Sequence, residues 1–275
     1  ILNQKVSGSR LGYAFSAHGL TGNLGWAVAP VFMVSLSTWF DWRAAYVGAG
    51  LLYLAILALL LFNREALHTE VVPHKQQSTD DRLLAFLKKP VVWWCFVFFL
   101  LSTMTLAVVQ SFAVSILQAM HQVSFEAATM TLTAYMLCAA AGMFVGGFVA
   151  ARWPKQSDRV VATCMTVAAL CMALCGSGWL EGLASMVILA ATGLAIGVGG
   201  PSRDMMIKKA TPKGATGRVY GIVYSGLDVG FAISPVVFGV FMDHGWYGAT
   251  LVGAAAVLLL SVLAALGVGR RTVQV

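Results

Sequence analysis

The chain has 275 residues, of which 59% are hydrophobic and only 11% are Asp, Glu, Lys or Arg. Soluble domains carry about 25% charged residues, and the mean hydropathy here is +0.81, so the composition excludes a water-soluble globule. The formal net charge of +7 then bears on membrane orientation rather than on nucleic-acid binding. We expect an integral membrane protein.

Eight apolar runs predict eight membrane-spanning α-helices, hence an all-α polytopic bundle. The runs bracket the ~20 residues that cross the hydrocarbon core, and they are too long for barrel strands. A lipid-facing backbone must satisfy its own polar groups, which requires helix. The predicted spans are 11–36, 44–62, 91–117, 127–151, 160–179, 183–200, 219–242 and 246–268.

Eight spans place both termini on one side of the membrane. Of the 18 Lys and Arg residues, all except Arg43 then fall on that side. Because positively charged loops stay in the cytoplasm, both termini are expected there, in a bacterial cytoplasmic (inner) membrane. The polar segment 63–90 predicts a cytoplasmic loop between two N-terminal helices, residues 1–62, and a six-helix bundle, residues 91–275. The first residue is Ile1 rather than Met, which predicts a fragment.

No cofactor or metal site is predicted. The five cysteines are odd in number, all lie in apolar runs, and none belongs to a Cys-x-x-Cys or Cys/His set. We therefore expect reduced thiols that pack as small hydrophobic side chains.

A shift of about 205 residues places segment 25–30 on segment 230–235, and both read Gly-x-x-x-small-Pro. Parallel repeats imply two similar halves with a substrate site between them near the midplane of the membrane. Gly25, Pro30 and Pro235 are therefore candidate hinge or gating residues. Chance similarity between glycine-rich membrane helices is the alternative.

Five segments together resemble the Major Facilitator Superfamily. They are Arg-Leu-Gly at 10–12, Gly-x-x-Gly-x-x-x-Ala-Pro at 22–30, Asp-Trp-Arg at 41–43, Gly-Gly-Pro-Ser-Arg-Asp at 199–204 and Thr-Pro-Lys-Gly at 211–214. The resemblance covers the whole chain if its spans are the fifth to twelfth of the usual twelve. It implies alternating access by rocking of two six-helix bundles, usually coupled to protons or an ion.

Two motifs carry the resemblance further. The segment Gly25-x-x-x-Ala29-Pro30 is similar to the fifth-span signature of antiporters, and this similarity implies export. The segment departs from the signature in Ala29, which replaces the final glycine, and in Met33 and Val34, which stand where a glycine pair is usual. The loop after span 127–151 matches the Gly-rich gating loop of the family in position and in Arg152, with Ala151 where an acid is common.

Asp228 is the only carboxylate well inside a predicted span. Burying a charge at this depth costs ~3 kcal/mol on insertion scales, and desolvation favours the protonated form. Asp228 is thus a candidate for proton coupling or for binding a cationic substrate, and a fixed hydrogen bond to a neighbouring helix or to Ser225 is the alternative. Asn23 takes the equivalent place in the repeat. It is a candidate polar residue of the cavity, and a hydrogen bond that only holds two helices together is the alternative.

His18 lies in the first predicted span on the same helix face as Gly22 and Gly25. An imidazole titrates near neutrality, so His18 is a candidate second relay group, with a neutral side chain packed on a partner helix as the alternative.

Gln110 and Tyr224 are candidates for hydrogen bonding to a substrate. Ser111, Tyr135 and Tyr220 suit the same role. For the tyrosines, aromatic packing is the alternative.

The stretch 193–201 has glycine repeatedly on one helix face and ends at a proline. Gly197, Gly200 and Pro201 are expected to allow close approach and then to break the helix, which predicts a hinge. Close packing without motion is the alternative. Arg203 and Asp204 follow at the cytoplasmic mouth, where a salt bridge opens and closes with the rocking, or where they are ordinary interfacial charges.

The leading hypothesis is a monomeric secondary transporter of a small organic solute, a drug or metabolite, that exports it in exchange for protons. A membrane-embedded enzyme would need an intramembrane nucleophile with a base, two close acids or metal ligands, and one aspartate with one distant histidine falls short of that. A non-transporting scaffold or a receptor would not explain the repeated proline-containing helices. A channel would need a ring of like side chains or a carbonyl filter motif, and the sequence shows neither.

Overall fold

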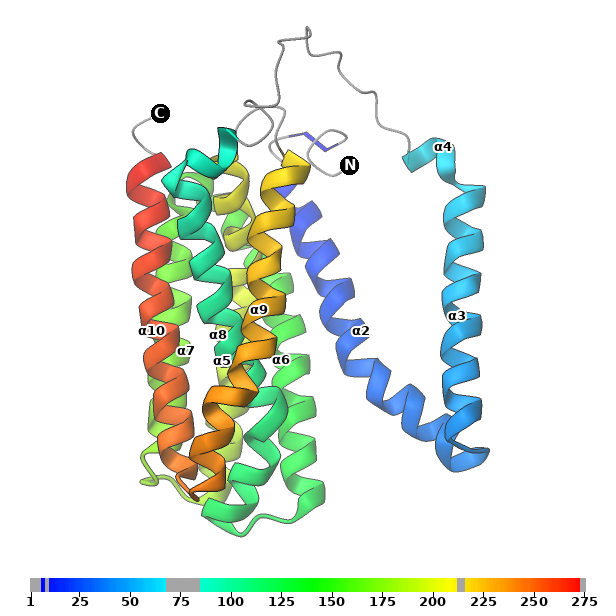
Figure 1. Ribbon diagram of the computed structural model, residues 1–275, viewed down its shortest axis with the longest axis vertical. Coiled ribbons are helices and arrows are strands. Elements are labelled where there is room, and N and C mark those ends of the chain that lie inside the picture. Colours follow the sequence, from blue (N-terminus) through cyan, green and yellow to red (C-terminus); the bar gives the residue numbers. More distant parts are fainter. Residues whose placement is uncertain (1–5, 8–9, 68–84, 212–215, 273–275) are drawn as a thin grey trace, which may run out of the picture.

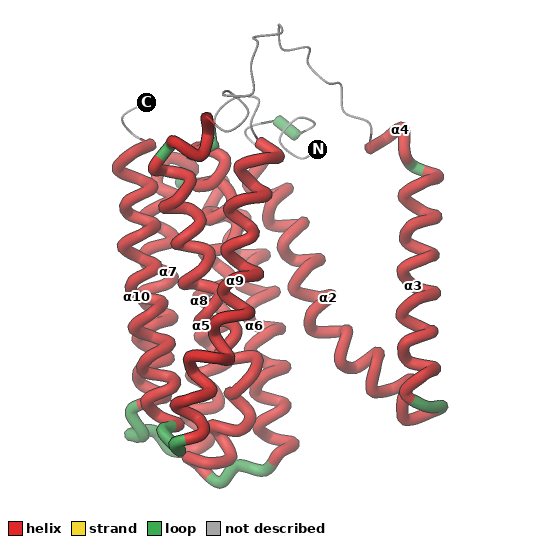
Figure 2. Tube along the Cα trace, in the orientation of Figure 1, coloured by secondary structure: helices red, strands yellow, loops and turns green. Residues whose placement is uncertain are grey.

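The computed structural model describes residues 6–7, 10–67, 85–211 and 216–272. Within the helices, the side chains of Asn23 and Pro30 lie outside the description, so the roles predicted for these two side chains stay untested. In the described part of the chain the regular structure is helical throughout (Figure 2). The predicted all-α fold is confirmed.

Six helices form an antiparallel bundle in the C-terminal part of the chain (Figure 1). They are α5 (Pro90–His121), α6 (Phe125–Arg152), α7 (Ser157–Gly176), α8 (Gly182–Ala210), α9 (Thr216–Asp243) and α10 (Tyr247–Thr272). Short 3₁₀ turns precede α5 and α7, at Ala85–Lys88 and Pro154–Gln156. The N-terminal part consists of α2 (Leu11–Trp39), α3 (Trp42–Phe62) and the short α4 (Arg64–Leu67).

Seven helices among the described residues are long and apolar enough to cross a membrane. They are α3 and the six of the bundle, with the span of α7 extended back to Pro154. The helix of the remaining predicted span, α2, has 29 residues and is long enough. The membrane fold is confirmed, and the eighth crossing rests on the length of α2.

The helix break predicted at Pro201 is wrong, because α8 continues through this proline to Ala210. A proline inside a helix removes one backbone hydrogen bond. Met206 and Ile207 beyond it are buried in the core, and this burial holds the last turns in place. Helix α9 likewise runs through Pro235, and α2 runs through position 30. Hinge motion at these positions stays a prediction.

Helices α6 and α8 approach each other backbone to backbone. A Cβ atom built on Gly197 would lie 2.1 Å from the carbonyl oxygen of Ala139, and one on Gly193 would lie 2.2 Å from that of Tyr135. A Cβ on Gly142, across the interface on α6, would lie 2.3 Å from the carbonyl oxygen of Leu194. No real side chain is tolerated at such distances, so the glycines permit the contact. The predicted close packing is present.

Helix α2 joins the N-terminal part to the bundle by packing on α6 and α8. The Ser16 hydroxyl donates to the carbonyl of Met143 at 2.7 Å, and Gly147 leaves the space that Ser16 fills. Helix α3 packs mainly on α2 and stands apart from the bundle (Figure 1). Most of its side chains are exposed, as expected for a helix that faces lipid or a further protein element.

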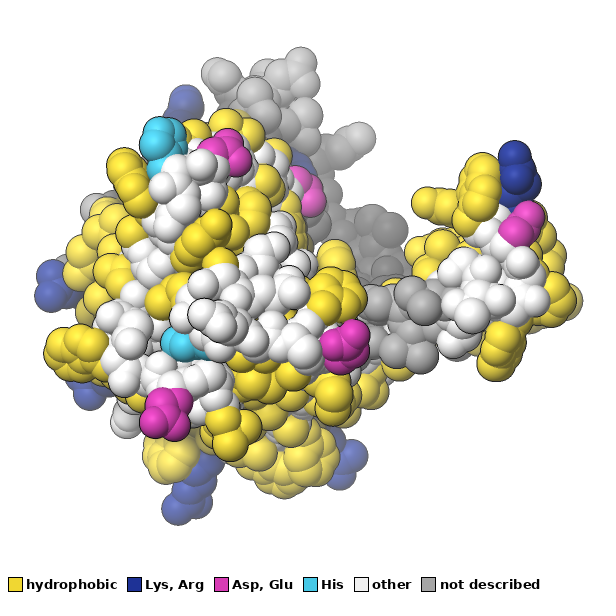
Figure 3. All heavy atoms as spheres, turned by 90° about the horizontal axis from the view of Figure 1, so that it is seen from below, with side chains coloured by type: hydrophobic (Ala, Val, Ile, Leu, Met, Phe, Trp, Pro, Cys, Tyr) yellow, Lys and Arg dark blue, Asp and Glu magenta, His cyan; other side chains and the backbone are white. Residues whose placement is uncertain are grey.

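The charged side chains separate between the two ends of the bundle. Glu126, Glu181 and Asp243 lie where the α5–α6, α7–α8 and α9–α10 turns form, an end that we call the acidic end (Figure 3). Arg152 and Lys209 lie at the opposite, basic end, near the chain termini (Figure 1). The assignment of the basic end to the cytoplasm stays a prediction.

A buried hydroxyl links α9 to α5, and its removal is expected to have a small, specific effect. Ser234 is fully buried, and its hydroxyl donates to the carbonyl of Met104 at 2.7 Å. Ser234→Ala should lower the free energy of unfolding by about 0.6 kcal/mol, the average for an interhelical hydrogen bond in a membrane protein. Unfolding in mixed SDS–detergent micelles measures it.

The matched control is Ser225→Ala on the same helix. The Ser225 hydroxyl donates to the carbonyl of Ile222 at 2.7 Å, within its own helix. This control should leave the unfolding free energy almost unchanged, and an equal loss in both variants would contradict an interhelical role for Ser234.

Candidate functional site

The structure pairs two of the predicted residues with each other inside α8. Arg203 Nε lies 3.3 Å from Asp204 Oδ1, and Asp204 is 5% exposed. The guanidinium carbon of Arg203 lies 4.9 Å from the centre of the Phe99 ring of α5, a cation–π contact. A buried charge requires such partners. Arg203 and Asp204 therefore pair with each other, and a bridge here that opens and closes with rocking stays a prediction.

Helix α9 adds two tyrosines to the pair. The Tyr220 hydroxyl donates to the backbone carbonyl of Asp204 at 3.5 Å, and the Tyr224 hydroxyl hydrogen-bonds to the Asp204 side chain. The rings of Tyr220 and Tyr224 meet edge to face with centroids 5.5 Å apart, and Tyr224 meets Phe99 in the same way at 5.3 Å. Side chains of α5, α8 and α9 thus meet around the Arg203–Asp204 pair. We call Phe99, Arg203, Asp204, Tyr220 and Tyr224 the Asp204 cluster.

His18 of α2 lies within electrostatic range of the Asp204 carboxylate. Its side chain is exposed. The cluster therefore borders the seam where the N-terminal part of the chain meets the bundle, and the structure brings His18 to the same site as Asp204 and Tyr224.

Asp228 lies on the same face of α9 as the tyrosines. Tyr220, Tyr224, Asp228 and Phe231 follow one another at spacings of four, four and three residues, which is one helix stripe. Phe231 stacks on Trp26 of α2, with ring centroids 6.3 Å apart and planes inclined by 16°. Asp228 is exposed between this contact and the Asp204 cluster.

The Ser225 hydroxyl does not donate to Asp228 in the structure. A hydroxyl has one proton to donate, and that of Ser225 goes to the carbonyl of Ile222. The Asp228 carboxylate is thus left available to solvent, a proton or a bound solute on the side of α9 that faces α2.

Gln110 shares a face of α5 with Phe99, by way of Thr103 and Leu106, at spacings of four, three and four residues. It is partly exposed, nearer the acidic end than the Asp204 cluster. Tyr135, by contrast, is buried against Gly193 at the α6–α8 contact, and its hydroxyl has no hydrogen-bond partner among the described residues. The structure therefore keeps Gln110 as a candidate and removes Tyr135 from the site.

The small-residue face of α2 lines a cavity instead of a close helix contact. Cβ atoms built on Gly22 and Gly25 would meet no atom within 4 Å. Both glycines border a cavity of about 560 Å³ between α2 and α3, whose walls include Trp26 and Tyr53. Gly25 thus lies on an open surface, whereas Gly197 lies in the tight α6–α8 contact.

A second charged residue of α8, Lys209, makes hydrogen bonds at the basic end. The Lys209 ammonium donates to the carbonyl of Pro154 and lies 3.3 Å from the Ser157 hydroxyl. It ties the last turn of α8 to the connection between α6 and α7. Sequence reasoning gave Lys209 no role, because a lysine near a helix end is ordinary in a cytoplasmic loop.

No group of three or more His, Cys, Asp or Glu side chains within the described ranges is placed to hold a metal ion. All five cysteines are free thiols. The side chains of the Asp204 cluster and the α9 stripe are charged, hydrogen-bonding and aromatic, and such groups suit proton uptake, ion pairing and contact with an organic solute.

Phe99 is the one member of the Asp204 cluster that sequence reasoning missed. A phenylalanine inside an apolar run gives no functional signal by itself, and only its spacing to Gln110 along α5 points to the same face.

A family model matches most of the chain. The model of the Major Facilitator Superfamily matches residues 1–157 and, in a second, overlapping match, residues 103–274. No curated protein matches the chain.

Proposed function

The chain belongs to the Major Facilitator Superfamily and is a membrane transporter rather than an enzyme, and we propose that it exports a small organic solute in exchange for protons. The division into residues 1–62, 63–90 and 91–275, the monomeric state and the placement of both termini in the bacterial cytoplasm are parts of the same proposal.

The observation that carries proton coupling is the position of the Asp204 cluster. Asp204 is a buried carboxylate paired with Arg203 inside a membrane span, and His18 approaches it from α2. When two bundles rock, α2 and the C-terminal helices change their relative position. The charges around Asp204 then change, and with them the affinity of this site for a proton.

Asp228 supplies the carboxylate that exchanges a proton for a cationic or amphiphilic solute. It lies one turn from Tyr224 and three residues before Phe231, which stacks on Trp26. Aromatic faces next to a carboxylate suit an organic cation, because the rings attract positive charge and the acid neutralises it. Gln110 adds a hydrogen-bonding group on the facing helix.

The test uses the full-length protein in proteoliposomes that contain a trapped pH-sensitive dye. We expect at least one of three organic cations, ethidium, Hoechst 33342 or tetraphenylphosphonium, to dissipate an imposed pH gradient. Asp228→Asn should lower that rate by more than about tenfold, which corresponds to about 1.4 kcal/mol of lost stabilisation.

Asp243→Asn is the matched control, because Asp243 ends the same helix at the acidic end and is exposed. This variant should keep the wild-type rate. Coupled proton movement that survives in Asp228→Asn would contradict the role of Asp228, and a gradient that none of the three cations dissipates would contradict the proposed exchange.

A further inference from the structure

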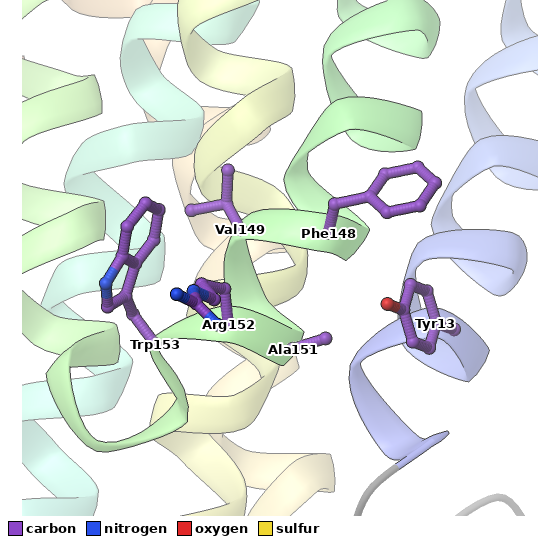
Figure 4. Close-up of a pocket in the computed structure, with 6 residues that line it drawn as sticks. All are labelled: Tyr13, Phe148, Val149, Ala151, Arg152 and Trp153. Carbon is purple, nitrogen blue, oxygen red and sulfur yellow. The ribbon is translucent and has the colours of Figure 1, made fainter.

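A cavity of about 550 Å³ lies at the basic end, where α2 begins and α6 ends. Figure 4 shows the side chains that line it, with those of α6 along one side and Tyr13 of α2 facing them. The lining residues are Tyr13, Phe148, Val149, Ala151, Arg152 and Trp153. None of them belongs to the Asp204 cluster or to the α9 stripe.

The cavity combines an apolar wall with a positive charge. The rings of Tyr13 and Phe148 meet edge to face across the two helices, with centroids 5.5 Å apart. Arg152 ends α6 and is exposed, and its guanidinium has no ion pair or hydrogen bond to any other residue that the structure describes. Trp153 follows, 49% exposed. A tryptophan beside an arginine at the end of a membrane helix is typical of the headgroup layer of the bilayer.

We propose that this cavity binds one anionic phospholipid of the adjacent leaflet. The lipid phosphate pairs with the Arg152 guanidinium, and one acyl chain lies against Phe148 and Val149. Basic pockets between membrane helices on the cytoplasmic side recognise anionic headgroups by this combination of charge and depth. A free anion would leave the apolar wall unused, and a zwitterionic headgroup would bring a second positive charge close to Arg152.

The position of the cavity gives the lipid a structural consequence. It lies next to the tight α2–α6 contact, where a Cβ built on Gly12 would lie 3.2 Å from the backbone nitrogen of Ala151 and where Ser16 bonds to Met143. A lipid seated there contacts both α2 and α6. It therefore stabilises the arrangement in which the N-terminal part is docked on the bundle.

Native mass spectrometry of the full-length protein in mild detergent tests the proposal. Titration with dioleoylphosphatidylglycerol should show one site that is tighter than any site for dioleoylphosphatidylcholine. Arg152→Gln should weaken the phosphatidylglycerol site by about fivefold, the effect of one arginine on an anionic lipid. Phe148→Ala should weaken it as well, because the acyl chain loses its wall.

Arg159→Gln is the matched control: Arg159 is exposed on the next helix and lies outside the cavity lining. This variant should bind the lipid as the wild type does, and equal weakening in both arginine variants would overturn the proposal in favour of diffuse charge attraction. In a competition experiment, inorganic phosphate at about 10 mM, in large excess over the lipid, should leave the lipid bound. Displacement by phosphate would identify a site for a free anion and would also overturn the proposal.

Discussion

Replacing Asp204 by asparagine should both destabilise the protein and abolish proton-coupled transport. The change leaves Arg203 in the interior without the carboxylate 3.3 Å away that neutralises it. Breaking a buried ion pair by removing one partner costs about 3 kcal/mol or more. It also removes the buried acid of the Asp204 cluster. Unfolding in SDS–detergent micelles and solute-driven proton movement in proteoliposomes measure the two effects.

A double variant separates these two effects. Arg203→Gln combined with Asp204→Asn removes both charges together, so it should recover most of the lost stability, because no uncompensated charge stays buried. It should still fail to couple proton and solute movement. Recovery of coupling along with stability would show that Asp204 acts only in folding, and would contradict its role in transport.

Gly197→Ala is expected to give the largest packing defect of any single methyl group in the bundle. The added Cβ would lie 2.1 Å from the carbonyl oxygen of Ala139, and backbone cannot move aside as a side chain does. Helices α6 and α8 must therefore separate along their contact. Overpacking of this kind costs about 1–3 kcal/mol, and we expect about 2 kcal/mol in the same unfolding measurement.

Gly221→Ala provides the comparison for Gly197→Ala. Gly221 lies inside α9, and a Cβ there would meet no atom within 4 Å. Alanine has the higher helix propensity, by up to about 1 kcal/mol, so this variant should be as stable as the wild type or more stable. Equal destabilisation of both variants would mean that backbone freedom at glycine, and not the α6–α8 contact, decides the loss at position 197.

The sequence correctly predicted that α8 is a helix, but it placed the C-terminal end of this helix too early. The proline at 201 argued for a break, since it removes a backbone donor, yet the helix continues to Ala210. Its later turns hold Met206 and Ile207 in the core, and that burial outweighs the missing hydrogen bond. A local rule was overruled here by packing, which a single sequence does not display.

At the candidate site, too, the sequence indicated some residues and only the packing of the helices revealed others. Hydropathy alone singled out Asp228, because a lone carboxylate in an apolar run is conspicuous. It did not indicate that Asp204 is the more enclosed of the two acids, because Tyr224 and His18 lie far from Asp204 in the chain and approach it only when α9 and α2 pack near α8. Phe99 carried no signal, because an aromatic residue in a membrane helix is ordinary.

The amino-acid order determined by itself that this chain is helical and crosses a membrane, because apolar runs of this length in lipid have no other way to satisfy their backbone polar groups. Which charges lie near one another was decided only by the tertiary structure. The glycines that let α6 and α8 touch, and the face of α9 that turns toward α2, set distances between residues far apart in the chain. The hydrophobicity of a segment can be read from that segment alone, whereas contacts between distant charged residues depend on how several helices are oriented when they pack.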